Sequence, residues 1–466
     1  MSVNLAAMSA SEVAAAVASG ALTASRSVEA ALARIESRNP GLNAFTAVTA
    51  DRARRRAAQI DARRARGEPV GSLAGVVFAV KNLFDIAGVA TLAGSKINRE
   101  RAAATADATL ARRLEAQDAI LVGALNMCEY AYDFTGENAH YGASRNPRDP
   151  RRMSGGSSGG SGAAVASGMT QIALGSDTNG SIRVPASFCG LFGLKPTYGR
   201  LSRAGTFPFV ASFDHLGPMA RSAADLALAY DAMQGHDPAD PAQAARAVEP
   251  TLPALDTGLA GLRVARAGGY FARGGQPESF AAVDQVARAL DATRVVEWPE
   301  VHRARAAAYV VTMAEGAALH LQRVRARPGD FDPDVRDRLI AGAMVPGAYV
   351  VKAQKFRRWF RDSVVKLFSD VDVIIAPATP CRAPLIGQKT MTLDGVETLI
   401  RPNLGVFTQP VSFIGLPVVC VPVWTPGEHL PIGAQIIAAP WREDIALRVA
   451  RALESMGVAR APVADA

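Results

Sequence analysis

Short apolar segments rich in β-branched residues are the feature that most restricts what this chain can fold into. They occur at residues 75–81 (GVVFAVK), 119–123 (AILVG), 371–380 (VDVIIAPATP), 416–424 (LPVVCVPVW) and 431–441 (PIGAQIIAAPW). Segments of this length without polar alternation are typical of strands that are buried on both faces of a sheet. An amphipathic stretch follows the first of them at 107–117 (DATLARRLEAQ). Strands that alternate with helices predict a layered α/β protein.

The composition provides enough apolar material for a large core. Of 466 residues, 49% are hydrophobic and 20% are charged, which excludes disordered, collagen-like and small disulfide-stabilised classes. The length fits about three domains or one large α/β domain.

Four segments are expected along the chain. Residues 1–70 are expected to form an N-terminal helical segment, with a helix stop at Asn39-Pro40-Gly41, and 75–225 are expected to contain the core strands and the Gly/Ser-rich loops. Residues 234–345 are rich in alanine and arginine and are expected to be a helical, more variable insertion. Residues 346–466 return to strand signals.

The positive charge gives little support to a nucleic-acid partner. Lys plus Arg number 51 against 43 for Asp plus Glu, and only seven of the cations are lysines. The densest basic stretch, 52–66, has the alanine content and spacing of a solvated helix face and has no aromatic or glycine-rich recognition elements beside it. We therefore expect no nucleic-acid partner, although electrostatic attraction of a small anionic substrate stays open.

Cysteine and histidine patterns give no sign of a disulfide framework or a metal site. The four cysteines form no CxxC pair, and the six histidines show no HExxH spacing. The N-terminal sequence lacks the basic and apolar regions of a secretory signal, and no stretch approaches 18 uninterrupted apolar residues. We expect a cytoplasmic protein without a membrane segment or a bound metal.

Two glycine- and serine-rich segments and one lysine carry the candidate chemistry. Residues 155–162 (GGSSGGSG) lack the Gly-Lys-Ser/Thr end of a phosphate-binding loop, so a close-approach loop and a linker are the remaining interpretations. Residues 175–183 (GSDTNGSIR) place a serine on a tight turn, and a serine needs a base to act as a nucleophile. No Ser/His/Asp pattern is present. Lys81 ends a predicted buried strand, where desolvation lowers the pKa of an amine, although a lone lysine is more often a surface cation.

Residues 155–197 closely resemble the amidase signature, and the flanking segments at 75–88 and 212–227 match the neighbouring blocks of that family. The resemblance extends over essentially the whole chain. It implies one amidase domain over residues 1–466, with a large, mixed, twisted β-sheet covered by helices on both faces. It also implies catalysis without a cofactor or a metal.

Carried over residue by residue, the resemblance implies a catalytic triad. Ser181 matches the nucleophile, Ser157 the bridging serine that a non-proline cis peptide holds, and Lys81 the general base.

The same resemblance implies an oxyanion hole of backbone N–H groups from Thr178, Asn179, Gly180 and Ser181. The family usually has Gly or Ala where this chain has Asn179, but asparagine tolerates left-handed backbone better than most residues.

A narrower resemblance concerns the substrate. Phrases such as 81–99 (KNLFDIAGVATLAGSKINR) are similar to a subgroup of amidases that convert 1-carboxybiuret to 1,3-dicarboxyurea in s-triazine breakdown. Arg401 is a candidate for holding a substrate carboxylate, with a surface arginine as the alternative, and Tyr132 is a candidate substrate contact, with a core aromatic as the alternative. Hydrolysis of another acidic ureide such as oxalurate, the glutaminase subunit of a tRNA-dependent amidotransferase and an inert scaffold subunit remain open.

The subgroup also implies partners. We expect a small helical subunit that resembles the small subunit of tRNA-dependent amidotransferases, in a homodimeric or heterotetrameric assembly.

Overall fold

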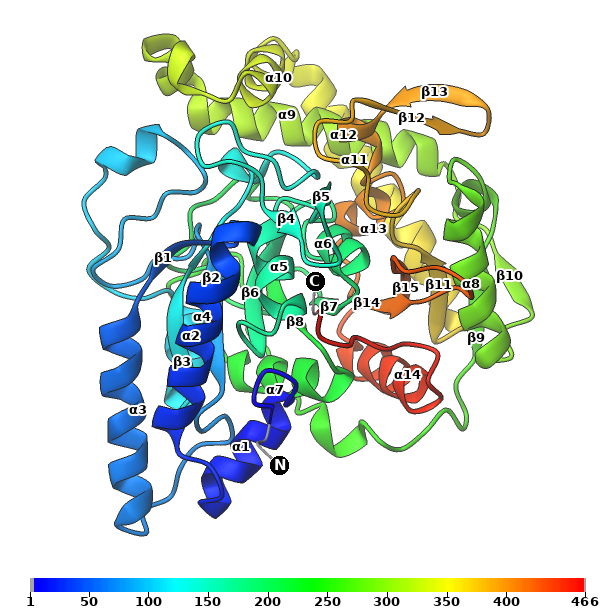
Figure 1. The fold of residues 1–466 in the computed structure, drawn as a ribbon. Helices are drawn as coiled ribbons and strands as arrows, with labels where there is room; N and C mark the ends of the chain where they lie inside the picture. Colours follow the sequence, from blue (N-terminus) through cyan, green and yellow to red (C-terminus); the bar gives the residue numbers. More distant parts are fainter. Residues whose placement is uncertain (1–3, 465–466) are drawn as a thin grey trace.

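A mixed sheet of eleven strands forms the centre of the computed structural model, which describes residues 4–464 (Figure 1). In spatial order the strands are β1 (Phe45–Val48), β3 (Ile120–Leu125), β2 (Val77–Lys81), β6 (Ile172–Asp177), β8 (His215–Ala220), β7 (Phe192–Lys195), β14 (Val418–Val423), β15 (Ile432–Ala438), β11 (Val373–Pro377), β9 (Val264–Ala267) and β10 (Arg294–Val296). Strands β3, β2 and β6 are parallel, as are β11, β9 and β10, and the other neighbours are antiparallel. Five of these strands are those expected from the apolar segments, and every residue in them is buried.

Two short hairpins and the helices complete the fold. The hairpins are β4 (Arg145–Asn146) with β5 (Asp149–Met153) and β12 (Thr390–Leu393) with β13 (Val396–Leu399). The α-helices are α1 (Ala10–Ser19), α2 (Ala24–Leu42), α3 (Ala50–Ala65), α4 (Thr109–Ala116), α5 (Gly159–Ala166), α6 (Arg183–Cys189), α7 (Ala223–Met233), α8 (Pro277–Ala289), α9 (Val301–Ala326), α10 (Pro333–Ala343), α11 (Gly347–Val365), α12 (Ile400–Asn403), α13 (Gln409–Phe413) and α14 (Glu443–Ser455). The 3₁₀ helices are η1 (Ile97–Glu100), η2 (Glu129–Ala131), η3 (Leu252–Ala254), η4 (Gly269–Ala272), η5 (Pro328–Asp330) and η6 (Lys366–Ser369). Within residues 4–464, no helix combines the length and the apolar character that crossing a bilayer requires.

Helices cover both faces of the sheet, as expected. Helices α5 and α6 pack against each other and against the central strands. Helices α7 and α14 also pack together, α7 against β6, β7 and β8, and α14 against β14 and β15 (Figure 1). Glycines in the sheet allow α6 to approach closely. A Cβ on Gly193 would lie 2.9 Å from Ala186 Cβ, and one on Gly433 would lie 2.8 Å from Ser187 Cβ. The small residues of α5 and α6 therefore bring the glycine- and serine-rich loops directly onto the sheet.

The N-terminal segment departs from the helical prediction at its second helix. The expected stop at Asn39-Pro40-Gly41 is wrong, because α2 runs through Pro40 and ends at Leu42. The cap residue Asn43 follows with a left-handed φ of 51°. Proline cannot donate the usual helical hydrogen bond. The Asn39 side chain stabilises this helix end, since its Oδ1 accepts from the N–H groups of Ala44 and Phe45 at 2.8 Å.

Strand β1 also lies inside the segment that was expected to be helical. It pairs antiparallel with β3, with Phe45 opposite Leu125. Because that partner is far away in sequence, the local pattern contains no signal for the strand.

The segment 234–345 was expected to be helical, and two short strands depart from that prediction. Strands β9 and β10 extend the sheet at the edge formed by β11, and both run parallel to it. Helices α10 and α11 both pack against α9, and α9 and α10 lie at the top of Figure 1. The segment therefore supplies both an edge of the sheet and a helical layer.

Candidate active site

Lys81 is the last residue of β2 and is fully buried. Its Nζ lies 2.6 Å from Ser157 Oγ and 2.8 Å from Ser176 Oγ, and both distances are those of hydrogen bonds. Strand β2 is parallel to β6, so the carboxyl ends of the two strands lie side by side and bring Lys81 next to Ser176. The structure thus places the predicted base against the predicted bridging serine.

Burial sets the proton affinity of this lysine. It lowers the pKa of Lys81 to about 7, because a charged ammonium is disfavoured away from water. Cys128, Asp214 and Asp177 act in the opposite direction, since negative charge near an amine favours its protonated form. Near neutral pH a substantial fraction of the Lys81 amine is uncharged, and an uncharged amine can accept a proton from a hydroxyl group.

Ser157 lies in a loop that leaves almost no free space. The peptide bond between Gly156 and Ser157 is cis. A Cβ on Gly156 would lie 2.7 Å from Cys128 Sγ and 2.8 Å from the backbone nitrogen of Gly136. Only glycine fits this position without displacing its neighbours.

The predicted oxyanion loop, 178–181, leads from β6 to α6. Gly180 has a φ of 142°, and a Cβ there would clash with Thr408 Oγ1. The Thr408 hydroxyl donates a 2.8 Å hydrogen bond to the backbone carbonyl of Asn179. This threonine therefore fixes the loop from the opposite side and excludes a side chain at Gly180.

A buried ion pair holds the two ends of this loop together. Arg183 donates to both carboxylate oxygens of Asp177, at 2.9 and 3.0 Å, and also to Gln435 Oε1 at 2.5 Å. Burial alone would raise the pKa of Asp177, but the Arg183 guanidinium keeps it well below its usual range. Ser412 donates to the same carboxylate at 2.9 Å. The contacts connect β6, α6, α13 and β15.

Asp214 holds the loop from a second direction. It accepts from the Thr178 hydroxyl at 2.6 Å and from the backbone N–H groups of Phe209 and Val210 at 2.8 and 3.0 Å. The two aspartates thus fix the turn that presents Ser181.

A cavity of about 330 Å³ lies beside the predicted oxyanion loop, and neither Lys81 nor Ser157 is among its lining residues. Ser181, Thr178 and Asn179 line it, together with the two predicted substrate contacts, Tyr132 and Arg401. The remaining walls come from η2 and the residues after it, from α9, α10 and α12, and from the first residue of α13. A cavity of this size suits a small molecule.

The two predicted substrate contacts have different surroundings. The Tyr132 hydroxyl is buried and has no hydrogen-bond partner within residues 4–464, and burial raises its pKa to about 12. Arg401 contacts three carboxylates: Asp133, Glu137 at 3.3 Å and Asp334 at 3.1 Å.

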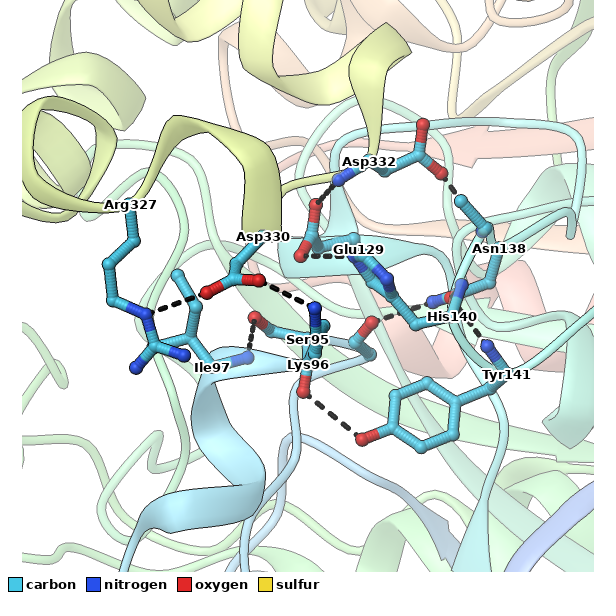
Figure 2. A network of polar contacts seen from close by, with 12 residues as sticks. Ser95, Lys96, Ile97, Glu129, Asn138, His140, Tyr141, Arg327, Asp330 and Asp332 are labelled. Carbon is cyan, nitrogen blue, oxygen red and sulfur yellow. Dashed lines mark hydrogen bonds and ion pairs between the residues drawn. The ribbon is translucent and has the colours of Figure 1, made fainter.

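A polar network fixes α10, one wall of the cavity, to the core (Figure 2). Glu129 Oε2 accepts from the backbone N–H of Asp332 at 2.7 Å, and Glu129 Oε1 lies 3.2 Å from His140 Nε2. Asp332 caps α10 by accepting from the N–H of Asp334 at 3.0 Å, and its other oxygen accepts from the N–H of Ala139 at 3.1 Å. Burial raises the pKa of Glu129 to about 8. The network connects η2, which leads to the cavity, with the start of α10.

Sequence reasoning missed two residues at this site. Ser176, the second partner of Lys81, lies one residue before the Asp177 of the same glycine- and serine-rich segment, and its proximity to Lys81 depends on the pairing of β2 with β6. Arg338 lies on the cavity wall, and nothing in the sequence distinguishes it from the other arginines of 234–345.

Comparison with known proteins gives the family. A sequence profile of the Amidase family matches residues 26–447. AtzE of Pseudomonas sp. (strain ADP), which is part of a 1-carboxybiuret hydrolase, is 55% identical over 446 residues, which are 95% of this chain and 97% of that protein. The A subunit of the glutamyl-tRNA(Gln) amidotransferase from Koribacter versatilis (strain Ellin345) is 37% identical over 93% of this chain and 95% of that protein.

The fold agrees with the sequence comparisons. A solved, inhibitor-bound structure of an s-triazine catabolic enzyme, described as a vestigial protein complex, superimposes with a TM-score of 0.96. The two chains are 54% identical, and the alignment covers 97% of this chain and 100% of that one. This chain belongs to the amidase signature family and is an amidase that acts on amide C–N bonds.

Proposed function

We propose that this amidase releases ammonia from a small acidic ureide and that the substrate is 1-carboxybiuret. The observation that carries the proposal is the fully buried Lys81 amine, 2.6 Å from Ser157 Oγ. The similarity to AtzE over 95% of the chain supports the substrate. Addition of one water to the terminal carbamoyl group of 1-carboxybiuret gives 1,3-dicarboxyurea and ammonia.

The proposed mechanism is a proton relay to a serine nucleophile. Uncharged Lys81 accepts the proton of Ser157, and Ser157 takes the proton of Ser181 as Ser181 Oγ bonds to the carbonyl carbon. The C–N bond then breaks, and Ser157 returns a proton to the departing ammonia. Water attacks the acyl-enzyme and regenerates Ser181. The hydrogen-bond distance between Lys81 and Ser157 supports the first link, and the second link, from Ser157 to Ser181, stays a prediction.

The negative charge that develops on the carbonyl oxygen needs donors. We assign this role to the backbone N–H groups of Thr178, Asn179, Gly180 and Ser181. The rigid support of this loop by Asp214 and Thr408 favours the assignment, because preorganised donors stabilise a transition state at no reorganisation cost. Loss of one such donor typically costs about 2.7–4 kcal/mol of transition-state stabilisation.

Tyr132 and Arg401 remain proposed contacts of the substrate. The Tyr132 hydroxyl lies on the cavity wall and has no hydrogen-bond partner within residues 4–464, which supports its assignment as a substrate contact. A substrate carboxylate at Arg401 has to compete with Asp133, Glu137 and Asp334 for the guanidinium.

A second candidate is glutamine hydrolysis, with the chain as the glutaminase subunit of a tRNA-dependent amidotransferase. The observation in its favour is the 37% identity to one chain of such an enzyme over 93% of this chain. The higher identity to AtzE favours the ureide. Ammonia release from glutamine, 1-carboxybiuret and oxalurate at equal concentrations separates the three substrates.

We further propose a cytoplasmic location and a small helical partner subunit. A relative with a TM-score of 0.96 is described as part of a protein complex, which supports a partner. All four cysteines are buried free thiols, which is usual in a reducing compartment. Light scattering of the chain, alone and after co-expression with small proteins encoded beside it, tests the assembly.

The decisive experiment is replacement of the nucleophile. Ser181→Ala is expected to abolish ammonia release from every amide and to prevent labelling by a serine-directed fluorophosphonate. Ser19→Ala, at an exposed serine of α1, is the matched control and is expected to retain both. Ammonia release by Ser181→Ala at more than about a tenth of the unmodified rate contradicts the mechanism. Absence of labelling in the unmodified protein supports the inert scaffold instead.

A further inference from the structure

A second cavity, of about 470 Å³, lies against α11 and shares no lining residue with the cavity beside Ser181. Its walls come from α11, from the loops after β7 and β15, and from the residues that follow α13. The lining includes three arginines and two aromatic residues, namely Arg357, Arg358, Arg361, Tyr198 and Trp441. Within the described residues 4–464, no aspartate or glutamate lines it. This arginine cavity therefore has the charge to attract an anion.

Arg357 is the anchored member of the three arginines. Its Nε and Nη2 donate to the backbone carbonyls of Phe413 and Ser212, at 2.5 and 2.7 Å. Its guanidinium also lies 4.7 Å from the centre of the Phe213 ring. Glu315 favours the charged form of Arg357, but this carboxylate accepts from the N–H of Ser212 at 3.1 Å instead of pairing with it. A partly buried cation without a paired carboxylate is unfavourable, and an anion in the cavity would stabilise it.

Arg358 and Arg361 add two exposed cations to the same wall. Neither forms an ion pair within residues 4–464. Burial lowers the pKa of Arg357, and the positive charge of Arg361 lowers this pKa further. Like charges three or four residues apart on a helix repel each other, so a multiply charged anion would relieve the repulsion. A phosphate group carries about −1.5 to −2 charges and three acceptor oxygens, which suit three arginines better than one carboxylate does.

Trp441 offers an aromatic surface to the same cavity. Its φ is 68°, a left-handed conformation that bulky residues rarely adopt, and such strained positions often occur at functional sites. Its backbone N–H donates to Thr197 Oγ1 at 2.8 Å, which helps to hold this conformation. Arg246 lies over the ring, 4.7 Å from its centre, and lines a neighbouring cavity instead of the arginine cavity. Because Trp441 lines both cavities, part of its ring stays available to a planar group in the arginine cavity.

We propose that the arginine cavity binds an organic phosphate. The phosphate group bonds to the guanidinium groups of Arg357, Arg358 and Arg361, and a planar organic group stacks on Trp441. Charge-assisted hydrogen bonds to arginine give such a site its affinity, and the cavity has a volume that is usual for small-molecule sites. Since the two cavities have no lining residue in common, the proposal holds whichever amide the enzyme hydrolyses.

Isothermal titration calorimetry with ADP, inorganic phosphate and adenosine tests the site. One ADP is expected to bind per chain, and more tightly than either of the others, because ADP alone supplies both the phosphate and the ring. The double variant Arg358→Gln with Arg361→Gln is expected to raise the Kd of ADP about tenfold or more. The matched control, Arg26→Gln with Arg55→Gln, removes the same charge at exposed arginines of α2 and α3 and is expected to keep the Kd unchanged.

A variant of the aromatic wall tests the organic part of the ligand. Trp441→Asn introduces a residue that tolerates left-handed backbone. It is expected to raise the Kd of ADP about fivefold or more and to leave that of inorganic phosphate within about twofold, because only stacking is lost. Unchanged melting temperatures of the variants exclude unfolding as the cause.

Three outcomes overturn the proposal. Absence of saturable ADP binding, or an equal loss of binding in the arginine variant and its control, shows that the arginine cavity is not the site. Adenosine that binds as tightly as ADP contradicts the role of the arginines. Inorganic phosphate that binds as tightly as ADP contradicts the role of Trp441 and with it an organic ligand.

Discussion

The protonation state of one amine governs the chemistry at the scale of single residues. Within residues 4–464, the hydrogen-bond partners of the Lys81 amine are the hydroxyls of Ser157 and Ser176, and neither carries a charge. A neutral amine has two N–H donors and one lone pair. If one N–H is donated to Ser176 Oγ, the lone pair is free to face Ser157. Ser176 therefore orients the base, although it lies outside the proposed proton relay.

The pKa of Lys81 predicts how activity depends on pH. Its value of about 7 lies below the ordinary value of 10.5, so the amine gains a proton as pH falls through 7 and can no longer accept one from Ser157. The ratio kcat/KM is expected to fall about tenfold per pH unit below 7 and to level off above about 8. Initial rates of ammonia release between about pH 5.5 and 9 measure this fall, which is the acid limb of the pH profile. A rate that is flat across that range contradicts a lysine base.

Variants of the two partners sharpen the same test. Lys81→Ala is expected to lower kcat by a factor on the order of 10² or more. Ser176→Ala is expected to lower kcat several-fold and to shift the acid limb to lower pH, because the charged amine loses an acceptor. Ser161→Ala is the control. It removes a buried hydroxyl that donates to the Leu174 carbonyl and not to Lys81, and it is expected to leave the pH of the acid limb unchanged.

Helix α10 forms one wall of the cavity at the scale of secondary-structure elements. It carries Arg338, and its first turn is fixed by Asp332 and by the buried Glu129 (Figure 2). His140 faces the Glu129 carboxyl, and partial burial lowers its pKa, so near neutral pH the pair is best described as a protonated Glu129 beside a neutral His140. Lys96 and Asp330 form a separate ion pair at 2.6 Å close by.

The raised pKa of Glu129 predicts a loss of stability as pH rises. In the folded state the carboxyl keeps its proton up to about pH 8, whereas the unfolded chain releases it near 4.5, so folding binds a proton between these values. The free energy of unfolding is therefore expected to decrease between about pH 5 and 8. Each pKa unit corresponds to about 1.4 kcal/mol, so the contribution is on the order of a few kcal/mol.

Glu129→Gln mimics the protonated carboxyl and is expected to flatten this dependence. Urea unfolding at about pH 5, 6.5 and 8 provides the measurement. Glu100→Gln, at a glutamate that pairs with Arg327 outside the cavity, is expected to keep the slope of the unmodified protein. A Glu129→Gln variant with an unchanged slope shows that this carboxyl titrates normally.

At the scale of the whole molecule, the site depends on segments that are remote in sequence. The buried Arg183 joins Asp177 of β6 to Gln435 of β15 and Ser412 of α13. Arg183→Met is expected to lower the free energy of unfolding by about 3–5 kcal/mol, because it leaves Asp177 buried without a counter-charge. The shift of the urea midpoint measures the effect.

Matched variants separate the ion pair from general damage. The double variant Asp177→Asn with Arg183→Met removes both charges and is expected to recover part of the stability. Arg151→Met, at an exposed arginine that pairs with Asp149, is expected to leave the midpoint unchanged. A double variant that is less stable than Arg183→Met alone rules out an uncompensated charge as the cause.

Local composition was sufficient to predict the core strands and the site loops. The buried strands β2, β3, β11, β14 and β15 follow from it, because a strand covered on both faces has to be apolar throughout. The assignment of Lys81, Ser157 and Ser181 rests on the resemblance to the amidase signature. The structure joins Lys81 to Ser157, and the link from Ser157 to Ser181 stays a prediction.

Which side chains meet depends instead on how remote segments pack. Strands β1, β9 and β10 are short and form because a distant edge offers hydrogen bonds, which no local pattern records. Ser176 reaches Lys81 through strand pairing. Arg338 lies in the cavity wall because α10 packs against α9. Neighbours along the chain determine whether a segment prefers a helix or a strand. The donors and acceptors that remain for a ligand depend on the hydrogen bonds that each side chain makes in the folded protein, and those bonds join segments that are remote in sequence.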